Sequence, residues 1–206
     1  MQALKDLLSH VPAYVTLQKV VGADRLRYRC IETAKLKPGD TVLDVGCGPA
    51  YYFEKLPQPI QYHGFDTEPR YVEWANKKWA GRGATIHLGI FDDEQAAKLP
   101  KVDAVLLLGL LHHLSDDESL QLLELAGRVL APGGRVVSVD TCFEPTQGRV
   151  SRFMSENDRG EFVREPKEFE DLARSAFASV EGYVEREATR VPGSHWMMTS
   201  REPLQH

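Results

Sequence analysis

Glycine and aspartate occur in this 206-residue chain at spacings that suit the binding of a nucleotide. Gly46 and Gly48 form a Gly-x-Gly turn directly after an apolar run that contains Asp44. Glycine has no Cβ, so such a turn lets the backbone approach a ligand closely. Asp66 lies 22 residues beyond Asp44, a spacing at which an acid can accept hydrogen bonds from ribose hydroxyls. A purely structural turn and a helix N-cap are the simpler interpretations.

Two adjacent histidines, His112 and His113, offer a second kind of chemistry. Imidazole titrates near neutral pH, so either side chain could act as a general base on a substrate hydroxyl. The alternative is that one of them packs and hydrogen-bonds inside the domain. Adjacent histidines without a further Asp or His at ligand spacing make a poor metal site. We therefore expect no metal ion.

Alternating segments of strand and helix type must position these residues. Strand-like segments cover residues 41–46, 61–66, 84–89, 103–109, 134–140, 179–188 and 195–201. Helical segments cover residues 50–56, 69–80, 117–130 and 167–177, and the first forty residues also have helical spacing. The alternation predicts a Rossmann-like, doubly wound α/β fold with a mostly parallel sheet of seven strands. The last two strands predict an antiparallel pair at one edge.

Composition and charge exclude several classes of protein. The net charge is −5 and no run of Lys and Arg occurs, which argues against a nucleic-acid partner. The longest apolar run, residues 104–111, is too short to span a bilayer. The start of the chain has no signal-peptide core, and three widely spaced cysteines favour reduced thiols. We expect one cytoplasmic domain, whose oligomeric state the sequence does not indicate.

Three motifs resemble those of class I methyltransferases, which depend on S-adenosylmethionine (SAM). Residues 42–49 resemble the first motif, V-L-D-x-G-C-G-x-G, with Ala50 in place of its third glycine. Residues 103–114 are similar to the fourth motif of small-molecule methyltransferases, which ends in Leu-His-His-Leu. Residues 130–134 match the L-x-P-G-G turn before the fifth strand. The resemblance covers about residues 40–140 and the rest of the chain only in outline.

The resemblance implies where the methionine part of SAM would bind. Gly46 and Gly48 would let the backbone pass beneath it, and Asp44 would orient its amino group. The backbone near Leu108 would accept a hydrogen bond from the same amino group. Tyr14 or Tyr28, from the N-terminal segment, would close over this part of the cofactor.

The nucleoside part of SAM would lie along the ends of the second and third strands. Asp66 would accept hydrogen bonds from the ribose, with Thr67 beside it; Thr67 or Glu68 could instead cap the next helix. Ile90 occupies the position where the family usually places an acid near the adenine amine. Ile90 and Phe91 could therefore sandwich the adenine ring, and a solvated acidic loop is the alternative.

Two regions outside the predicted SAM-binding core, residues 39–142, would recognise the methyl acceptor. They are an N-terminal helical cap at 1–38 and a substrate-side insertion with a C-terminal hairpin at 143–206. Arg152, Arg159 and Arg164 in the insertion could bind an anionic acceptor through forked hydrogen bonds. They could equally belong to a solvated, salt-bridged lid.

The expected reaction is methyl transfer from SAM to an oxygen or nitrogen of a small molecule, as in a biosynthetic pathway. S-adenosylhomocysteine (SAH) would be the product. The protein would mainly align the reactants and exclude water, and a hydroxyl acceptor would use His113 or His112 as base. One alternative is a catalytically silent SAM-binding partner protein. Another is an NAD(P)-dependent oxidoreductase, which the Gly-x-Gly-x-Ala spacing and the lack of a Tyr-x-x-x-Lys pair disfavour.

Overall fold

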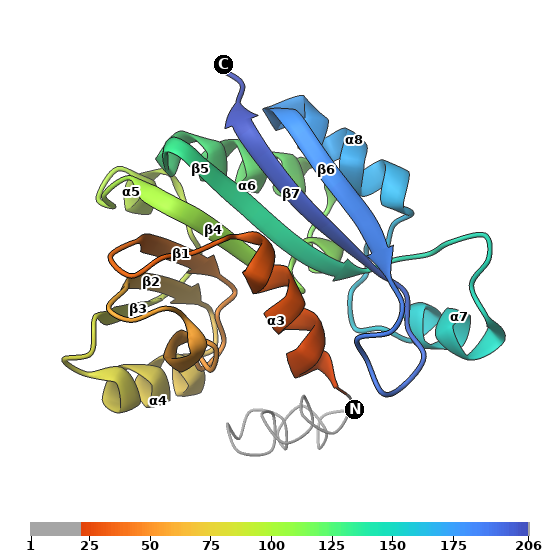
Figure 1. Ribbon diagram of the computed structural model, residues 1–206, viewed down its shortest axis with the longest axis horizontal. Helices are drawn as coiled ribbons and strands as arrows, with labels where there is room; N and C mark the ends of the chain where they lie inside the picture. Colours follow the sequence, from red (N-terminus) through yellow and green to blue (C-terminus); the bar gives the residue numbers. More distant parts are fainter. Residues whose placement is uncertain (1–21, 206) are drawn as a thin grey trace.

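A sheet of seven strands organises the computed structural model, which describes residues 22–205. The strand order is β3-β2-β1-β4-β5-β7-β6, and helices cover both faces (Figure 1). The strands are β1 (Thr41–Val45), β2 (Gln61–Asp66), β3 (Ala84–Leu88), β4 (Val102–Leu108), β5 (Leu130–Thr141), β6 (Phe177–Glu185) and β7 (His195–Pro203). Strands β1 to β5 pair in parallel, and β7 is antiparallel to both of its neighbours. The predicted Rossmann-like sheet and its antiparallel edge pair are confirmed.

Helices begin where local sequence favours a start. Ser115 and Glu118 form a capping box at the start of α6, and Pro166 occupies the first turn of α8. The helices are α3 (Ala23–Thr33), α4 (Pro69–Trp79), α5 (Asp93–Ala96), α6 (Asp116–Val129), α7 (Arg149–Glu156) and α8 (Pro166–Ala176), with 3₁₀ helices η1 (Phe53–Lys55) and η2 (Leu111–His113). Between residues 22 and 205, no helix is long and apolar enough to cross a bilayer.

Two hydrophobic clusters, one on each face of the sheet, fix the central strands. Ala104 and Leu106 belong to one cluster, and Val105 and Leu107 belong to the other. This division follows from the alternation of side chains along a strand. All of these side chains are fully buried, as predicted for a central strand covered on both sides.

The helix predicted over residues 50–56 is wrong. This segment forms turns and only the short helix η1. Ala50 has a φ of 50°, a left-handed conformation that an α-helix does not contain and that glycine adopts more easily. The Ala50 side chain is fully buried. The residue at the usual position of the third glycine therefore keeps the glycine-like backbone and adds a packed methyl group.

Helix α7 lies in the polar segment 143–165, where the sequence shows no helix. Its buried residues are Ser151 and Ser155, whereas Val150 and Phe153 are more than half exposed. Val150, Phe153 and Met154 recur at helical spacing, but they lie on the exposed face of α7 and do not mark its inward face. Tyr14 and most of the predicted helical cap lie outside the described residues.

Candidate active site

The carboxyl ends of β1, β4 and β5 border a cavity of about 430 Å³. Gly46, Leu108 and Val139 line its sheet side, and Arg27 of α3 lies beside them. The opposite wall comes from the insertion after β5 and from the β6–β7 loop. The cavity thus lies at the edge of the sheet where open α/β folds bind ligands.

The turn after β1 has the backbone shape that its glycines predict. Gly46 and Gly48 have φ values of 72° and 55°, and a Cβ on Gly46 would lie 3.2 Å from the Leu110 side chain. Asp44, at the end of β1, is 2% exposed and accepts a hydrogen bond from the Tyr62 hydroxyl at 2.5 Å. Burial raises the pKa of Asp44 to about 7, although the Tyr62 hydrogen bond acts in the opposite direction.

We expect Asp44 to make the protein less stable as pH rises. Its pKa of about 7 in the folded protein exceeds the ordinary value of 3.8, so folding strengthens proton binding. The stability that comes from this proton is present below about pH 4 and is lost by about pH 7. Between pH 5 and 8, the unfolding free energy of the wild type should fall by about 2–3 kcal/mol more than that of Asp44→Asn. Urea unfolding at both pH values tests this, and equal pH dependence of the two proteins would contradict it.

Asp66 joins the turns that follow β1 and β2. Its two carboxylate oxygens accept hydrogen bonds from the backbone N–H of Gly48 at 2.7 Å and of Glu68 at 2.8 Å. The N-cap of α4 is Glu68, whose side chain accepts from the backbone of Arg70, so Asp66 does not have that role. Each carboxylate oxygen can accept more than one hydrogen bond, so Asp66 could also accept hydrogen bonds from ribose hydroxyls. Thr67, beside Asp66, is exposed.

The structure does not support an adenine sandwich between Ile90 and Phe91. Phe91 is only 7% exposed and packs against Phe65, with ring centroids 5.2 Å apart. Phe91 is therefore a core residue, because the chain turns inward after the exposed Ile90. Ile90 is 68% exposed and remains available to one face of a bound base.

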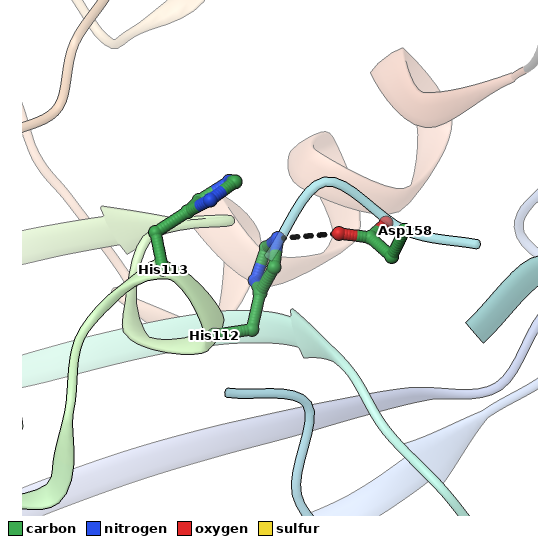
Figure 2. A group of neighbouring side chains, drawn as sticks. All are labelled: His112, His113 and Asp158. Atoms are coloured by element: carbon green, nitrogen blue, oxygen red, sulfur yellow. Dashed lines mark ion pairs between the residues drawn. The ribbon is translucent and has the colours of Figure 1, made fainter. Parts of the chain in front are cut away.

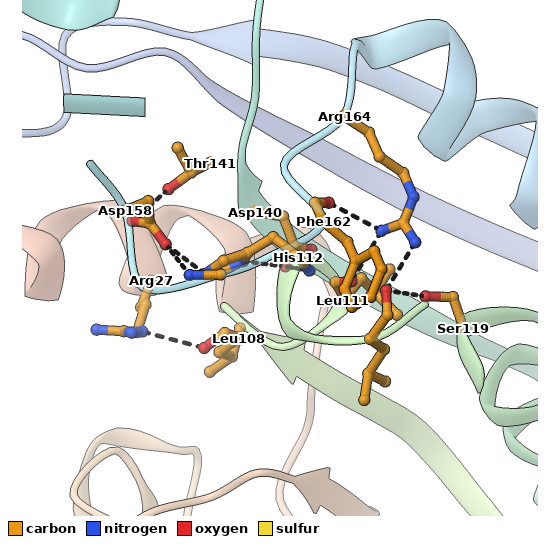
Figure 3. A network of polar contacts seen from close by, with 12 residues as sticks. Arg27, Leu108, Leu111, His112, Ser119, Asp140, Thr141, Asp158, Phe162 and Arg164 are labelled. Atoms are coloured by element: carbon orange, nitrogen blue, oxygen red, sulfur yellow. Dashed lines mark hydrogen bonds and ion pairs between the residues drawn. The ribbon is translucent and has the colours of Figure 1, made fainter. Parts of the chain in front are cut away.

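His112 is enclosed by two carboxylates (Figure 3). Its Nδ1 lies 2.8 Å from Asp140 Oδ1 and its Nε2 lies 3.2 Å from Asp158 Oδ1. Burial lowers the pKa of His112, but the hydrogen bonds and charges of the two aspartates outweigh burial and raise it to about 9. At neutral pH the ring is therefore protonated and has no free lone pair. In this arrangement His112 cannot be the general base that the motif suggested.

His113 differs from its neighbour in exposure and in charge. Its side chain is exposed and lines the cavity. Burial of part of the ring and the adjacent His112 lower the pKa of His113, so its imidazole is neutral at pH 7 and can accept a proton. Of the two predicted bases, His113 is the one that the structure leaves able to act.

Residues 158–164, which we call the strap, cross the Leu-His-His-Leu segment. The Phe162 N–H donates to the His112 carbonyl at 3.0 Å, and the Thr141 hydroxyl lies 3.3 Å from an Asp158 carboxylate oxygen. The Arg164 guanidinium also donates to the Leu111 carbonyl at 2.9 Å (Figure 3). Asp158 lies 46 residues after His112, so no short sequence pattern connects the two.

Gly160 lets the strap approach His112 closely. A Cβ on Gly160 would lie 2.2 Å from the His112 ring and 2.4 Å from the His112 carbonyl oxygen, and the backbone atom cannot move aside alone. We therefore expect Gly160→Ala to lower the unfolding free energy by about 2–3 kcal/mol. Gly148→Ala is the control for steric conflict, because a Cβ there has no atom within 4 Å. Gly148 is the N-cap of α7, where alanine is less favourable than glycine, so this substitution should cost no more than about 1 kcal/mol. Urea unfolding compares them, and similar effects of the two substitutions would contradict the strap contact.

The three arginines proposed for an acceptor lie in different surroundings. Arg164 is buried and donates to backbone carbonyls, so its predicted substrate role is wrong. Arg152 on α7 pairs with Glu156 at 2.9 Å and lies over the Phe143 ring. It does not line the cavity, so the structure does not support its predicted substrate role. Arg159 lines the cavity, and the described part of the chain offers it no ion pair.

Residues 42–134 match the family described as a methyltransferase domain. The curated 27-O-demethylrifamycin SV methyltransferase of Amycolatopsis mediterranei (strain S699) is 32% identical over 129 residues. The match covers 59% of this chain and 46% of that protein, so this chain spans less than half of that relative.

Solved structures share the fold over nearly the whole chain. One belongs to the complex between the Haloferax volcanii Trm112 methyltransferase activator and a putative methyltransferase. It has a TM-score of 0.71 at 18% identity and covers 96% of this chain and 97% of that one. The SAM-dependent methyltransferase SibL has a TM-score of 0.68 at 21% identity, over 93% of this chain and 56% of that one. Residues 42–134 thus match a methyltransferase domain, and the strand order and the glycine turn agree with the class I SAM-dependent type of that domain.

Proposed function

We propose that this protein transfers the methyl group of SAM to an oxygen or nitrogen of a small molecule and releases SAH. One observation carries the proposal. A single cavity joins the Gly46 turn and the Leu108 strand end, where the family resemblance places the methionine part of SAM, to His113 and Arg159. In this proposal, residues 39–142 bind the cofactor and residues 143–206 form the side of the cavity that binds the acceptor.

The residues at the strand ends fit SAM. Gly46 and Gly48 have positive φ values, Gly46 lines the cavity, and Asp66 offers carboxylate oxygens to the ribose. The Arg27 guanidinium lies over Gly109 and donates to the Leu108 carbonyl at 3.3 Å. Its charge suits the carboxylate of the methionine part. SAM, when bound, supplies a methyl group already activated by its sulfonium.

The protein's contribution to the reaction is alignment, exclusion of water and removal of one proton. His113 is neutral at pH 7 and faces the cavity, so it suits the role of base toward an acceptor hydroxyl. An amine acceptor that is already deprotonated would need only positioning. Arg159 lies in the same cavity and would attract an acceptor that carries a carboxylate or phosphate.

A covalent thiol mechanism does not fit this site. Cys142 follows β5 but is fully buried, and burial raises its pKa to about 12. A thiol with such a pKa is not a nucleophile at neutral pH. The curated relative from Amycolatopsis is named as an O-methyltransferase of a rifamycin, which supports a small-molecule hydroxyl as the acceptor.

Ligand binding and product release test the proposal together. Calorimetric titration should show binding of SAM and SAH and no binding of NAD. SAH release should then be measured across hydroxylated and aminated small molecules, with and without acidic groups. Binding of NAD in place of SAM would overturn the proposal. Tight SAM binding without SAH release from any acceptor would favour the catalytically silent partner protein.

A further inference from the structure

Three potential metal ligands converge on the wall of the cavity. His112, His113 and Asp158 each offer one ligand atom, and these atoms lie within 4.8 Å of one another (Figure 2). Two imidazole nitrogens and one carboxylate oxygen form a donor set of mononuclear sites for divalent transition metals. We propose that this cluster binds a divalent transition-metal ion of the Zn²⁺ type. The fold assembles the set, since the histidines lie on η2 and Asp158 lies on the strap.

Asp140 orients His112 for this role. The Asp140 carboxylate is 2% exposed and accepts from both Nδ1 and the backbone N–H of His112, at 2.8 and 3.2 Å. Ligating histidines usually donate their second ring nitrogen to a carboxylate in this way, which fixes the ring and the tautomer. The other nitrogen, Nε2, therefore points toward Asp158 and is the atom presented to a metal.

The distance between His112 Nε2 and Asp158 Oδ1 suits a tetrahedral ion. Two ligand atoms, each about 2.0–2.1 Å from Zn²⁺, lie about 3.3 Å apart when the angle between them is tetrahedral. His112 Nε2 and Asp158 Oδ1 are 3.2 Å apart. His113 must turn to complete the set, and its exposed side chain leaves it free to do so.

Charge also favours a divalent ion between these groups. Two carboxylates, Asp140 and Asp158, contact the single buried imidazole of His112. A proton on this ring leaves the three groups with one uncompensated negative charge. A divalent ion bound to the neutral ring balances both carboxylates, which matters where burial makes unpaired charge costly. Arg27 and Arg159 line the same cavity and also supply positive charge. Arg159 does so from an exposed position, where water screens its charge.

The open coordination positions would face the cavity, because His113 and Asp158 both line it. With a metal bound, His113 would be a ligand and not the base, and an acceptor oxygen at an open position would release its proton to water more easily. This role of the metal in removing the acceptor's proton rests on the proposed methyl transfer, whereas binding of the metal does not. The cluster differs from the SAM-binding residues, so binding of SAH reports on the cofactor site independently.

Titration of Zn²⁺ into tag-free, chelator-treated protein at pH 7.5 tests the proposal. Wild type should bind Zn²⁺ with one class of site, and Mg²⁺, which prefers oxygen ligands, should not compete. His113→Ala is the deciding variant, because His113 makes none of the hydrogen bonds that attach the strap. It should weaken Zn²⁺ binding at least tenfold. His195→Gln removes another histidine of the same cavity and should change the affinity less than threefold.

Absorption of bound Co²⁺ provides a second measurement. Its visible bands should report nitrogen and oxygen ligands of low coordination number in wild type and should be lost in His113→Ala. Equal Zn²⁺ affinity of wild type and His113→Ala, or no binding by either protein, would overturn the proposal and leave the cluster as an ion pair. Zn²⁺ binding in a protein that binds no SAM would refute the proposed function and keep the metal site.

Discussion

Replacement of Asp66 by Asn is expected to weaken SAH binding at least 100-fold. The substitution removes the charge that would accept hydrogen bonds from the ribose, and such charge-assisted bonds contribute about 1.5–3 kcal/mol each. It also disturbs the turn, because Asp66 accepts from the backbone of both Gly48 and Glu68. An amide can present its oxygen to only one of these donors, and its NH₂ group would then face the other. Calorimetric titration of SAH into both proteins measures the effect.

Glu68→Gln is the matched control for Asp66→Asn. Glu68 lies in the same turn, and its side-chain oxygen caps α4 by accepting from the Arg70 backbone. Gln keeps that acceptor, so SAH affinity should change by less than threefold. If Asp66→Asn also bound SAH within threefold of wild type, the ribose would have to be recognised elsewhere in the protein.

The SAM side of the site was predictable because it depends on short segments. The strand before Asp44, the turn of Gly46 and Gly48, and the acid at Asp66 are each local features with a fixed geometry. Parallel pairing of β1 with β2 and β4 then brings the strand ends to one edge of the sheet. The same logic failed at Ala50, since a single alanine does not reveal its left-handed backbone.

The acceptor side was not predictable, because it depends on contacts between distant segments. The Leu-His-His-Leu pattern suggested two equivalent bases, and only packing distinguishes them. His112 is enclosed by Asp140 from β5 and Asp158 from the strap, whereas His113 remains exposed. The strap itself follows α7, whose apolar residues lie on its exposed face and whose buried residues are serines. A pattern of residue types cannot report such long-range ion pairs.

Arg164→Met is expected to lower the unfolding free energy by about 3–4 kcal/mol. Arg164 is 6% exposed, and its guanidinium donates to the carbonyl oxygens of Leu111, Leu114 and Phe162 at 2.9, 2.7 and 3.1 Å. Methionine keeps an apolar chain of similar length but leaves three carbonyls without this donor, at about 1 kcal/mol each. Asp116, which pairs with the same guanidinium at 2.7 Å, has a side chain that is 75% exposed. Asp116→Asn should therefore cost less than about 1 kcal/mol.

The same substitution should separate cofactor binding from methyl transfer. Arg164 attaches the strap to η2, which presents His113 to the cavity, but it is not among the residues that line the cavity. In Arg164→Met, SAH affinity should stay within threefold of wild type while kcat for an identified acceptor falls at least tenfold. Urea unfolding, calorimetry and SAH release measure the three quantities. Equal losses of stability from Arg164→Met and Asp116→Asn would show that the ion pair and not the carbonyl network attaches the strap. Unchanged stability of Arg164→Met would show that neither does.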